Sequence, residues 1–250
     1  MYHFLVISMD NDNGEKRRSV LNYDYTWIEG LSGRDLDNPI VQDVHKKMFL
    51  RYNVDKHSNK FNGYVGNFSS HIKTLQYIVK EKLNNCVLLE DDSILTKENL
   101  PDPTTLPQDG MTLFSGRLQK PTWKNLKEWH QNGEPQKIIQ TFQQGINLMD
   151  YDTFRFTQSN AIFIPNETVA KDVLHHMKTS KYKYKSMDLY YSQHKLVKYL
   201  YYPAPFIHDD LLAKVGSNIN SLHGVMKDYV LIQPPKSRTN NRHFYPEHLI

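Results

Sequence analysis

Apolar residues along this chain fall into two patterns, short unbroken runs and longer stretches with helical spacing. The runs lie within segments that have the length of buried strands, residues 3–9, 86–89, 111–116 and 160–165. Apolar residues at helical spacing predict helices over residues 38–52, 66–83 and 166–180. Strands that alternate with helices indicate an α/β fold, so we expect a single domain with a mixed Rossmann-type sheet flanked by helices.

Weaker patterns complete the expected order of elements. They predict a helix over residues 15–23, a strand over 23–30 and a helix over 187–195. Residues 196–207 alternate and then meet two prolines, which favours an edge strand. The pattern between 117 and 158 is poor. There we interpret 138–142 as a strand and place Trp123 and Trp129 in a short helix.

Polar residues that can cap helices precede three of the expected helices. Asn38 stands directly before Pro39, and Asn166 stands before Glu167, both at expected N-termini. Asn67 or Ser69 can cap the helix expected over 66–83. These caps fix where we expect the helices to begin.

Three consecutive acids, Glu90, Asp91 and Asp92, follow the apolar run 86–89. In α/β sheets, ligands bind beyond the carboxyl ends of the strands. Neighbouring carboxylates repel one another unless a cation offsets their charge, and Mg²⁺ or Mn²⁺ prefers oxygen ligands and shares them with phosphates. The run therefore indicates either a metal that grips a nucleotide diphosphate or a solvated acidic turn.

Composition narrows the class of protein only a little. The 31 basic and 27 acidic residues give a net charge of +4, and the two basic clusters at 15–19 and 178–185 are small. A dedicated nucleic-acid binder usually has a more concentrated basic stripe, so no nucleic acid is expected. The single cysteine, Cys86, allows no disulfide within the chain. With no signal peptide or membrane span recognisable, we expect a cytoplasmic protein.

The segment GNFSSHIKTLQYIVKEKLNNCVLLEDDSIL, residues 66–95, resembles the signature of glycosyltransferase family 25, the lipooligosaccharide-type sugar transferases. The matching features are a glycine (Gly66), a Ser-His pair on a helix (Ser70 and His71) and a strand that ends in Glu-Asp-Asp. Weaker similarity extends over roughly residues 3–210, and small viral glycosyltransferase domains are of similar type. One departure is Glu90, which stands where a strict Asp-x-Asp motif has Asp.

The resemblance implies a GT-A fold. Its nucleotide-binding part would take about residues 1–95 and its acceptor-binding part about 96–210, with 211–250 as a C-terminal extension on the surface. It also implies an inverting transfer from a UDP- or GDP-linked sugar to a glycan hydroxyl, with Mn²⁺ or Mg²⁺ as cofactor. Asp92 is then the first metal ligand, with Glu90 beside it. His208, or alternatively Asp209, would supply a late ligand.

Further roles follow from the same resemblance. Asp188 matches a late aspartate and is the expected catalytic base, although an aspartate there could equally interact with a helix N-terminus. Asp91 is expected to face the donor sugar or the sheet. The donor pocket and its diphosphate are expected to contact Ser70, His71, Arg17 and Arg18. His71 could instead be a packing residue, and the two arginines a solvated surface pair.

Two other functions remain open at this point. A nucleotidyltransferase would use a similar fold and similar acids, but it should carry a glycine-rich phosphate loop after the first strand, and residues 10–18 contain one glycine. A non-catalytic module could bind a polyanion or nucleic acid through the basic cluster 178–185 and the basic tail.

Overall fold

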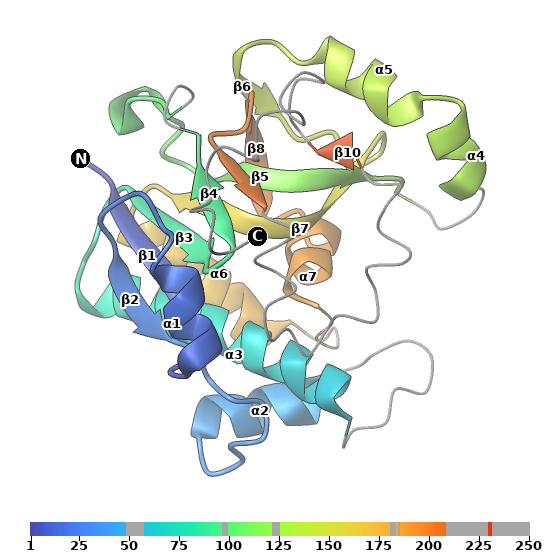
Figure 1. Cartoon of the computed structure of the whole chain (residues 1–250). Coiled ribbons are helices and arrows are strands. Elements are labelled where there is room, and N and C mark those ends of the chain that lie inside the picture. Colours follow the sequence, from blue (N-terminus) through green and yellow to red (C-terminus); the bar gives the residue numbers. More distant parts are fainter. Residues whose placement is uncertain are drawn as a thin grey trace.

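The computed structural model describes residues 1–48, 58–96, 100–121, 126–180, 184, 186–208 and 230–231. A central sheet has the strand order β2-β1-β3-β7-β5-β8-β6, with β10 paired to β5 (Figure 1). Its strands are β1 (His3–Ser8), β2 (Thr26–Glu29), β3 (Cys86–Glu90), β5 (Met111–Gln119), β6 (Gly145–Leu148), β7 (Arg155–Ile164), β8 (Val197–Tyr202) and β10 (Val230–Leu231). A second sheet pairs β4 (Ser93–Leu95) with β9 (Phe206–His208).

The central sheet is mixed, as the sequence predicts. β1 runs parallel to both β2 and β3, and β5 runs parallel to β8. β7 is antiparallel to its two neighbours, β3 and β5. The carboxyl ends of β1, β2 and β3 therefore lie at one edge, where loops can present polar side chains.

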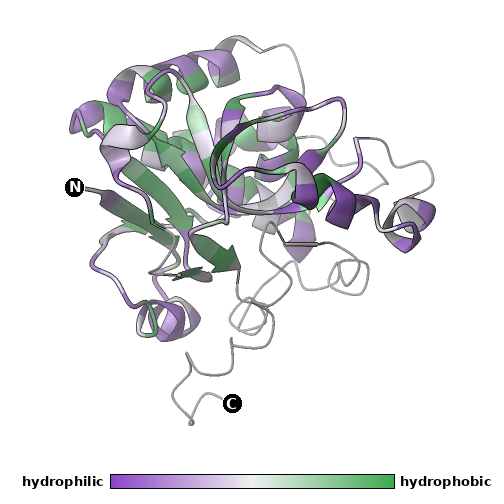
Figure 2. Ribbon diagram, turned by 90° about the horizontal axis from the view of Figure 1, so that it is seen from above, coloured by the Kyte–Doolittle hydropathy of each residue, from purple (hydrophilic) through white to green (hydrophobic). Residues whose placement is uncertain are grey.

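Helices cover the sheet, and the single α/β domain is confirmed. They are α1 (Asp12–Arg18), α2 (Pro39–Lys47), α3 (Asn59–Lys80), α4 (Leu126–Gln131), α5 (Glu134–Thr141), α6 (Glu167–Thr179) and α7 (Met187–Gln193), with a short 3₁₀ turn at Pro103–Thr105. α2 and α3 lie together at one end of the molecule, while α4 and α5 lie near β6 and β10 (Figure 1). Strands are mostly hydrophobic and the outer helices carry the polar residues (Figure 2).

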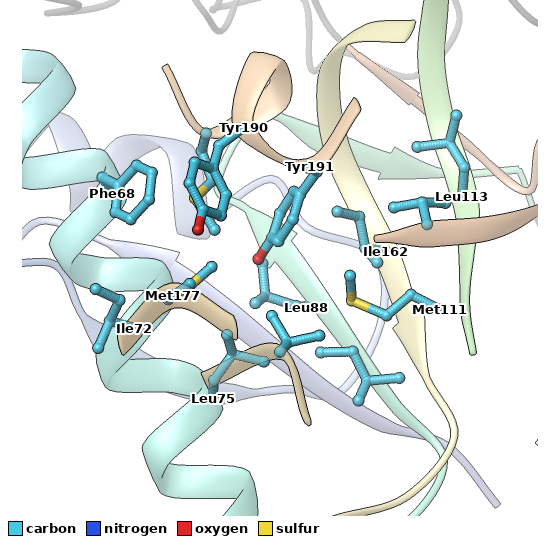
Figure 3. Close-up of a cluster of buried hydrophobic side chains, with 14 of the residues drawn as sticks. Phe68, Ile72, Leu75, Leu88, Met111, Leu113, Ile162, Met177, Tyr190 and Tyr191 are labelled. Carbon is cyan, nitrogen blue, oxygen red and sulfur yellow. The ribbon is translucent and has the colours of Figure 1, made fainter. Parts of the chain in front are cut away.

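The main core forms where α3, α6 and α7 pack on the sheet. Phe68, Ile72 and Leu75 project from one face of α3 toward Leu88 and Ile162 of the strands (Figure 3). Tyr190 and Tyr191 of α7 are almost fully buried in the same cluster, at 1% and 0% exposure. These two tyrosines therefore stabilise the fold by packing.

The N-terminal caps at Asn38 and Asn166 are confirmed, whereas the start of α3 was predicted wrongly. Asn38 Oδ1 accepts the Ile40 N–H at 3.0 Å, and Asn166 Oδ1 accepts the Val169 N–H at 3.0 Å. α3 begins at Asn59 because Ser58, rather than Asn67 or Ser69, caps it. Gly63 and Gly66 lie inside this helix.

Two further predictions are corrected by the fold. The stretch 138–142, predicted as a strand, lies largely in α5, which begins after Gly133 in a left-handed conformation (φ 68°) and has Pro135 in its first turn. β8, predicted as an edge strand, is an inner strand because β6 pairs with it on the outside. A short apolar run does not by itself distinguish helix from strand, and neighbours in a sheet are set by tertiary contacts.

Candidate active site

The three acids lie at the junction of the two sheets. Glu90 is the last residue of β3, and a turn at Asp91 and Asp92 leads directly into β4. Asp91 and Asp92 are both buried, each at 7% exposure. In a strand, side chains point alternately to the two faces of the sheet, but the turn at Asp91 and Asp92 ends this pattern. Each of the three carboxylates therefore contacts a different part of the fold.

Asp91 points back toward β1 and α1. Its Oδ2 accepts a hydrogen bond from Ser8 Oγ at 2.7 Å, and its Oδ1 pairs with the Arg17 guanidinium at 2.9 Å. Burial raises the pKa of Asp91, and the charge of Arg17 partly opposes that rise. The carboxylate thus holds Arg17 against the end of β1.

Arg18 completes this corner by connecting β1 with β2. Its guanidinium donates to Ser8 Oγ at 2.8 Å and to the Met9 carbonyl at 2.9 Å. It also lies 4.1 Å from the centre of the Trp27 ring, whose Nε1 donates to the Ser8 carbonyl at 3.0 Å. The structure therefore brings both predicted arginines to the carboxyl ends of β1 and β2, where Arg17 pairs with Asp91 and Arg18 with Ser8.

Glu90 points toward α3. Asn67 Nδ2 donates to Glu90 Oε1 at 2.8 Å, and His71 Nε2 lies 3.4 Å from the same oxygen. The other ring nitrogen of His71 lies 3.3 Å from the Tyr191 hydroxyl. A series of polar contacts therefore connects Tyr191 of α7, through His71, with Glu90. Asn67 was considered only as a cap. Asn67 precedes His71 by four residues, so both lie on one helix face, and this spacing could have indicated Asn67 as a site residue.

Asp92 points toward β7. Asn160 Nδ2 lies 3.4 Å from Asp92 Oδ1, and the Asn160 carbonyl accepts a hydrogen bond from Ser93 Oγ at 2.7 Å. Asn160 is buried at 1% exposure, and its Oδ1 has no hydrogen-bond partner among the described residues. No local pattern singled out Asn160, because only strand pairing brings it to the acids.

The backbone of His208 lies beside the acids. In the β4–β9 pair His208 is opposite Ser93, the residue that follows Asp92. Asp209, the alternative late ligand, lies outside the described residues. Within the part of the chain that the structure describes, no three His, Cys, Asp or Glu side chains gather closely enough to form a metal site by themselves.

Asp188 and Ser70 have different surroundings. Asp188 lies in the first turn of α7, and Thr157 Oγ1 of β7 lies 3.4 Å from its Oδ2. Its charge adds to the effect of burial in raising the pKa of Tyr64 to about 12. The Ser70 hydroxyl donates to the Gly66 carbonyl and accepts the Leu31 N–H, each within 2.8 Å, so it connects α3 with the loop after β2.

Comparison with known families decides the class of protein. The family model described as Glycosyltransferase family 25 (LPS biosynthesis protein) matches residues 1–132, which is more than half of the chain. The chain belongs to glycosyltransferase family 25. A search of curated proteins found no match.

Membership of family 25 makes this chain a nucleotide-sugar-dependent glycosyltransferase, which confirms the resemblance and leaves the two other functions without support. The matched residues include Arg17, His71 and the three acids, whereas Asp188 and His208 lie beyond them. Among the helices described for this family 25 chain, none has the length and apolar character needed to cross a membrane.

Proposed function

We propose that this glycosyltransferase is metal-dependent and inverting, and that it transfers a sugar from a UDP- or GDP-linked donor to a glycan hydroxyl. One observation carries the proposal: the β4–β9 pairing brings the backbone of His208 opposite Ser93, directly beside the buried Asp92. Two residues far apart in the sequence thereby meet at the carboxyl end of β3, where α/β sheets bind ligands.

The residues at this end of β3 fit a divalent cation. Asp92 offers a carboxylate, His208 is an imidazole residue, and the buried Asn160 Oδ1 is an oxygen without a hydrogen-bond partner among the described residues. This mixed oxygen and nitrogen set favours Mn²⁺ over Mg²⁺. When bound, the metal would neutralise charge on the diphosphate as it leaves. Glu90, held by Asn67 and His71, would support the ligands from α3.

The remaining residues divide into two roles. Asp188 is proposed as the base that takes the proton of the acceptor hydroxyl, with Thr157 orienting its carboxylate. Asp91 is expected to face either the donor sugar or the sheet, and its contacts with Ser8 and Arg17 support a positioning role. We propose that Arg17 and Arg18, held at the end of β1, favour the negatively charged diphosphate.

Thermal stability tests the metal and donor together. UDP- and GDP-linked sugars with Mn²⁺ are expected to raise the melting temperature of the natural chain, because ligands that bind only the folded state stabilise it. Asp92→Asn should lose the part of this shift that requires Mn²⁺. Asp152→Asn is the matched control, since the Asp152 side chain is 96% exposed. A shift that persists without metal, or survives in Asp92→Asn, would contradict the proposed metal site.

A further inference from the structure

Polar side chains gather on the neighbouring strands β5 and β7, away from the three acids. The register pairs Arg117 with Thr157 and Gln119 with Arg155. In an antiparallel pair, opposite residues share a face, and residues two positions apart on one strand also share it. These four side chains therefore project from the same face of the central sheet.

This face is the one that approaches the proposed base. Thr157 Oγ1 lies 3.4 Å from Asp188 Oδ2, so the face carrying Thr157 looks toward the N-terminal turn of α7. Arg155 is two residues along β7 from Thr157, a step of roughly 7 Å. A sugar whose hydroxyl reaches Asp188 would therefore place its other substituents near Arg155.

The polar groups on this face are incompletely paired. Gln119 is 4% exposed and its Oε1 is buried without a hydrogen-bond partner, and the buried Arg155 Nε also has none. Across the described residues, the Arg155 side chain forms no ion pair or hydrogen bond. Arg117, at 5% exposure, has contacts of its own and adds a second positive charge. Arg155 is partly exposed and has no anionic partner among the described residues, so its guanidinium can receive the anion of a ligand.

We propose that Arg117, Gln119 and Arg155, here called the β5–β7 arginine cluster, bind a carboxylate or phosphate group of the acceptor glycan. This inference rests on the proposed function, because it takes Asp188 as the base. A guanidinium binds carboxylate and phosphate oxygens through paired N–H donors, and the unpartnered Gln119 Oε1 can accept a hydrogen bond from a hydroxyl of the same sugar. The enzyme would thus prefer an acidic acceptor over a neutral one.

Direct binding of simple sugars tests this preference without any donor. The probes are glucose, glucuronic acid and glucose 6-phosphate, titrated into the full chain and followed by NMR. The natural chain is expected to bind the acidic probes about tenfold more tightly than glucose, since one charge-assisted contact has roughly that effect. Arg155→Gln should abolish the preference and Arg155→Lys should retain part of it. Lys137→Gln, which removes an exposed charge paired with Glu134, should leave it unchanged.

Several results would overturn the proposal. Equal binding of glucose and both acidic probes to the natural chain would do so, as would a preference that survives in both Arg155→Gln and Gln119→Leu. A loss of UDP affinity in Arg155→Gln as large as the loss for the acidic sugars would assign the cluster to the donor instead. The preference for acidic sugars is measured in the absence of any nucleotide sugar. If no nucleotide sugar binds the natural chain, the proposed function is therefore wrong whatever the result for the acidic sugars. Arg155→Lys and Gln119→Leu carry the test if Arg155→Gln does not fold.

Discussion

At the scale of single residues, the acids after β3 coexist because each has its own partners. Glu90 is held by α3, Asp91 by Ser8 and Arg17, and Asp92 lies beside Asn160. The repulsion expected from three adjacent carboxylates is thus reduced before any ligand binds. Asp91 forms an ion pair with Arg17.

The Arg17–Asp91 pair is therefore expected to contribute to stability. Arg17→Gln would leave the buried Asp91 carboxylate without its cation and should lower the free energy of unfolding by about 3 kcal/mol. Urea unfolding followed by circular dichroism measures this change. Lys16→Gln, an exposed position in the same helix, should change it by less than about 0.5 kcal/mol.

A double mutant separates this pair from a general effect on α1. In Arg17→Gln/Asp91→Asn the buried charge is absent, so part of the lost stability should return relative to Arg17→Gln alone. Strict additivity of the two single changes would mean that Arg17 and Asp91 do not interact, and the positioning role given to Asp91 would then be wrong.

At the scale of elements, α3 connects the core to the acids and also supports the loop after β2. Gly66, in the middle of this helix, lies against that loop: a Cβ added there would be 2.6 Å from the Leu31 carbonyl oxygen. A Cβ added at Gly33 in the loop would be 2.0 Å from the Asn62 carbonyl oxygen of the helix. The Ser70 hydroxyl forms hydrogen bonds with both the helix and the loop, and these stabilise the close contact between them. This contact explains why a glycine and a serine stand four residues apart, at Gly66 and Ser70.

Gly66→Ala is expected to destabilise the protein although alanine favours helices. The usual helix gain of about 1 kcal/mol is outweighed because the added methyl meets backbone rather than a movable side chain. We expect a net loss of roughly 2 kcal/mol by urea unfolding, and a similar loss for Gly33→Ala.

Gly110→Ala provides the matched comparison. The three atoms nearest to its added methyl all belong to the side chain of Lys198, which is half exposed and can move, so the loss should be clearly smaller. Stabilisation by Gly66→Ala would show that the helix and the loop are not in close contact in solution.

At the scale of the whole molecule, tyrosines buried in the core make stability depend on alkaline pH. Burial raises the pKa values of Tyr64, Tyr184 and Tyr190 from 10.0 to about 12. Tyr190 lies beside Phe68 and Met177 in the interior, where an ionised phenol would be poorly solvated (Figure 3). The folded protein therefore keeps protons on these groups that the unfolded chain releases.

The sign of the pH effect follows from that difference. The stabilisation is complete below the unfolded pKa of about 10, and it is lost as the pH rises from there toward the folded value of about 12. We expect the free energy of unfolding to decrease steadily from about pH 10 to about pH 12, measured by urea unfolding. Ultraviolet absorbance should report fewer ionised tyrosines in the folded than in the unfolded chain. A flat profile over this range would show that these phenols are not buried.

The sequence by itself determined several of the elements and the class of protein. Apolar runs predicted β1 and β3, helical spacing predicted most of α3 and α6, and the segment 66–95 identified the family. These features depend on residues close together in the chain, whose periodicity and capping chemistry are local. The same local nature explains the mistaken start of α3, since Ser58 was a competing cap eight residues earlier than Gly66.

Only the tertiary structure decided which side chains meet. Asn160 reaches Asp92 through the β3–β7 pairing, and His208 comes opposite Ser93 through β4–β9. Arg155 and Gln119 become neighbours through β5–β7. Each of these contacts joins residues more than thirty positions apart. Such pairings are selected by burial of the whole sheet, for which no short stretch of sequence carries a signal.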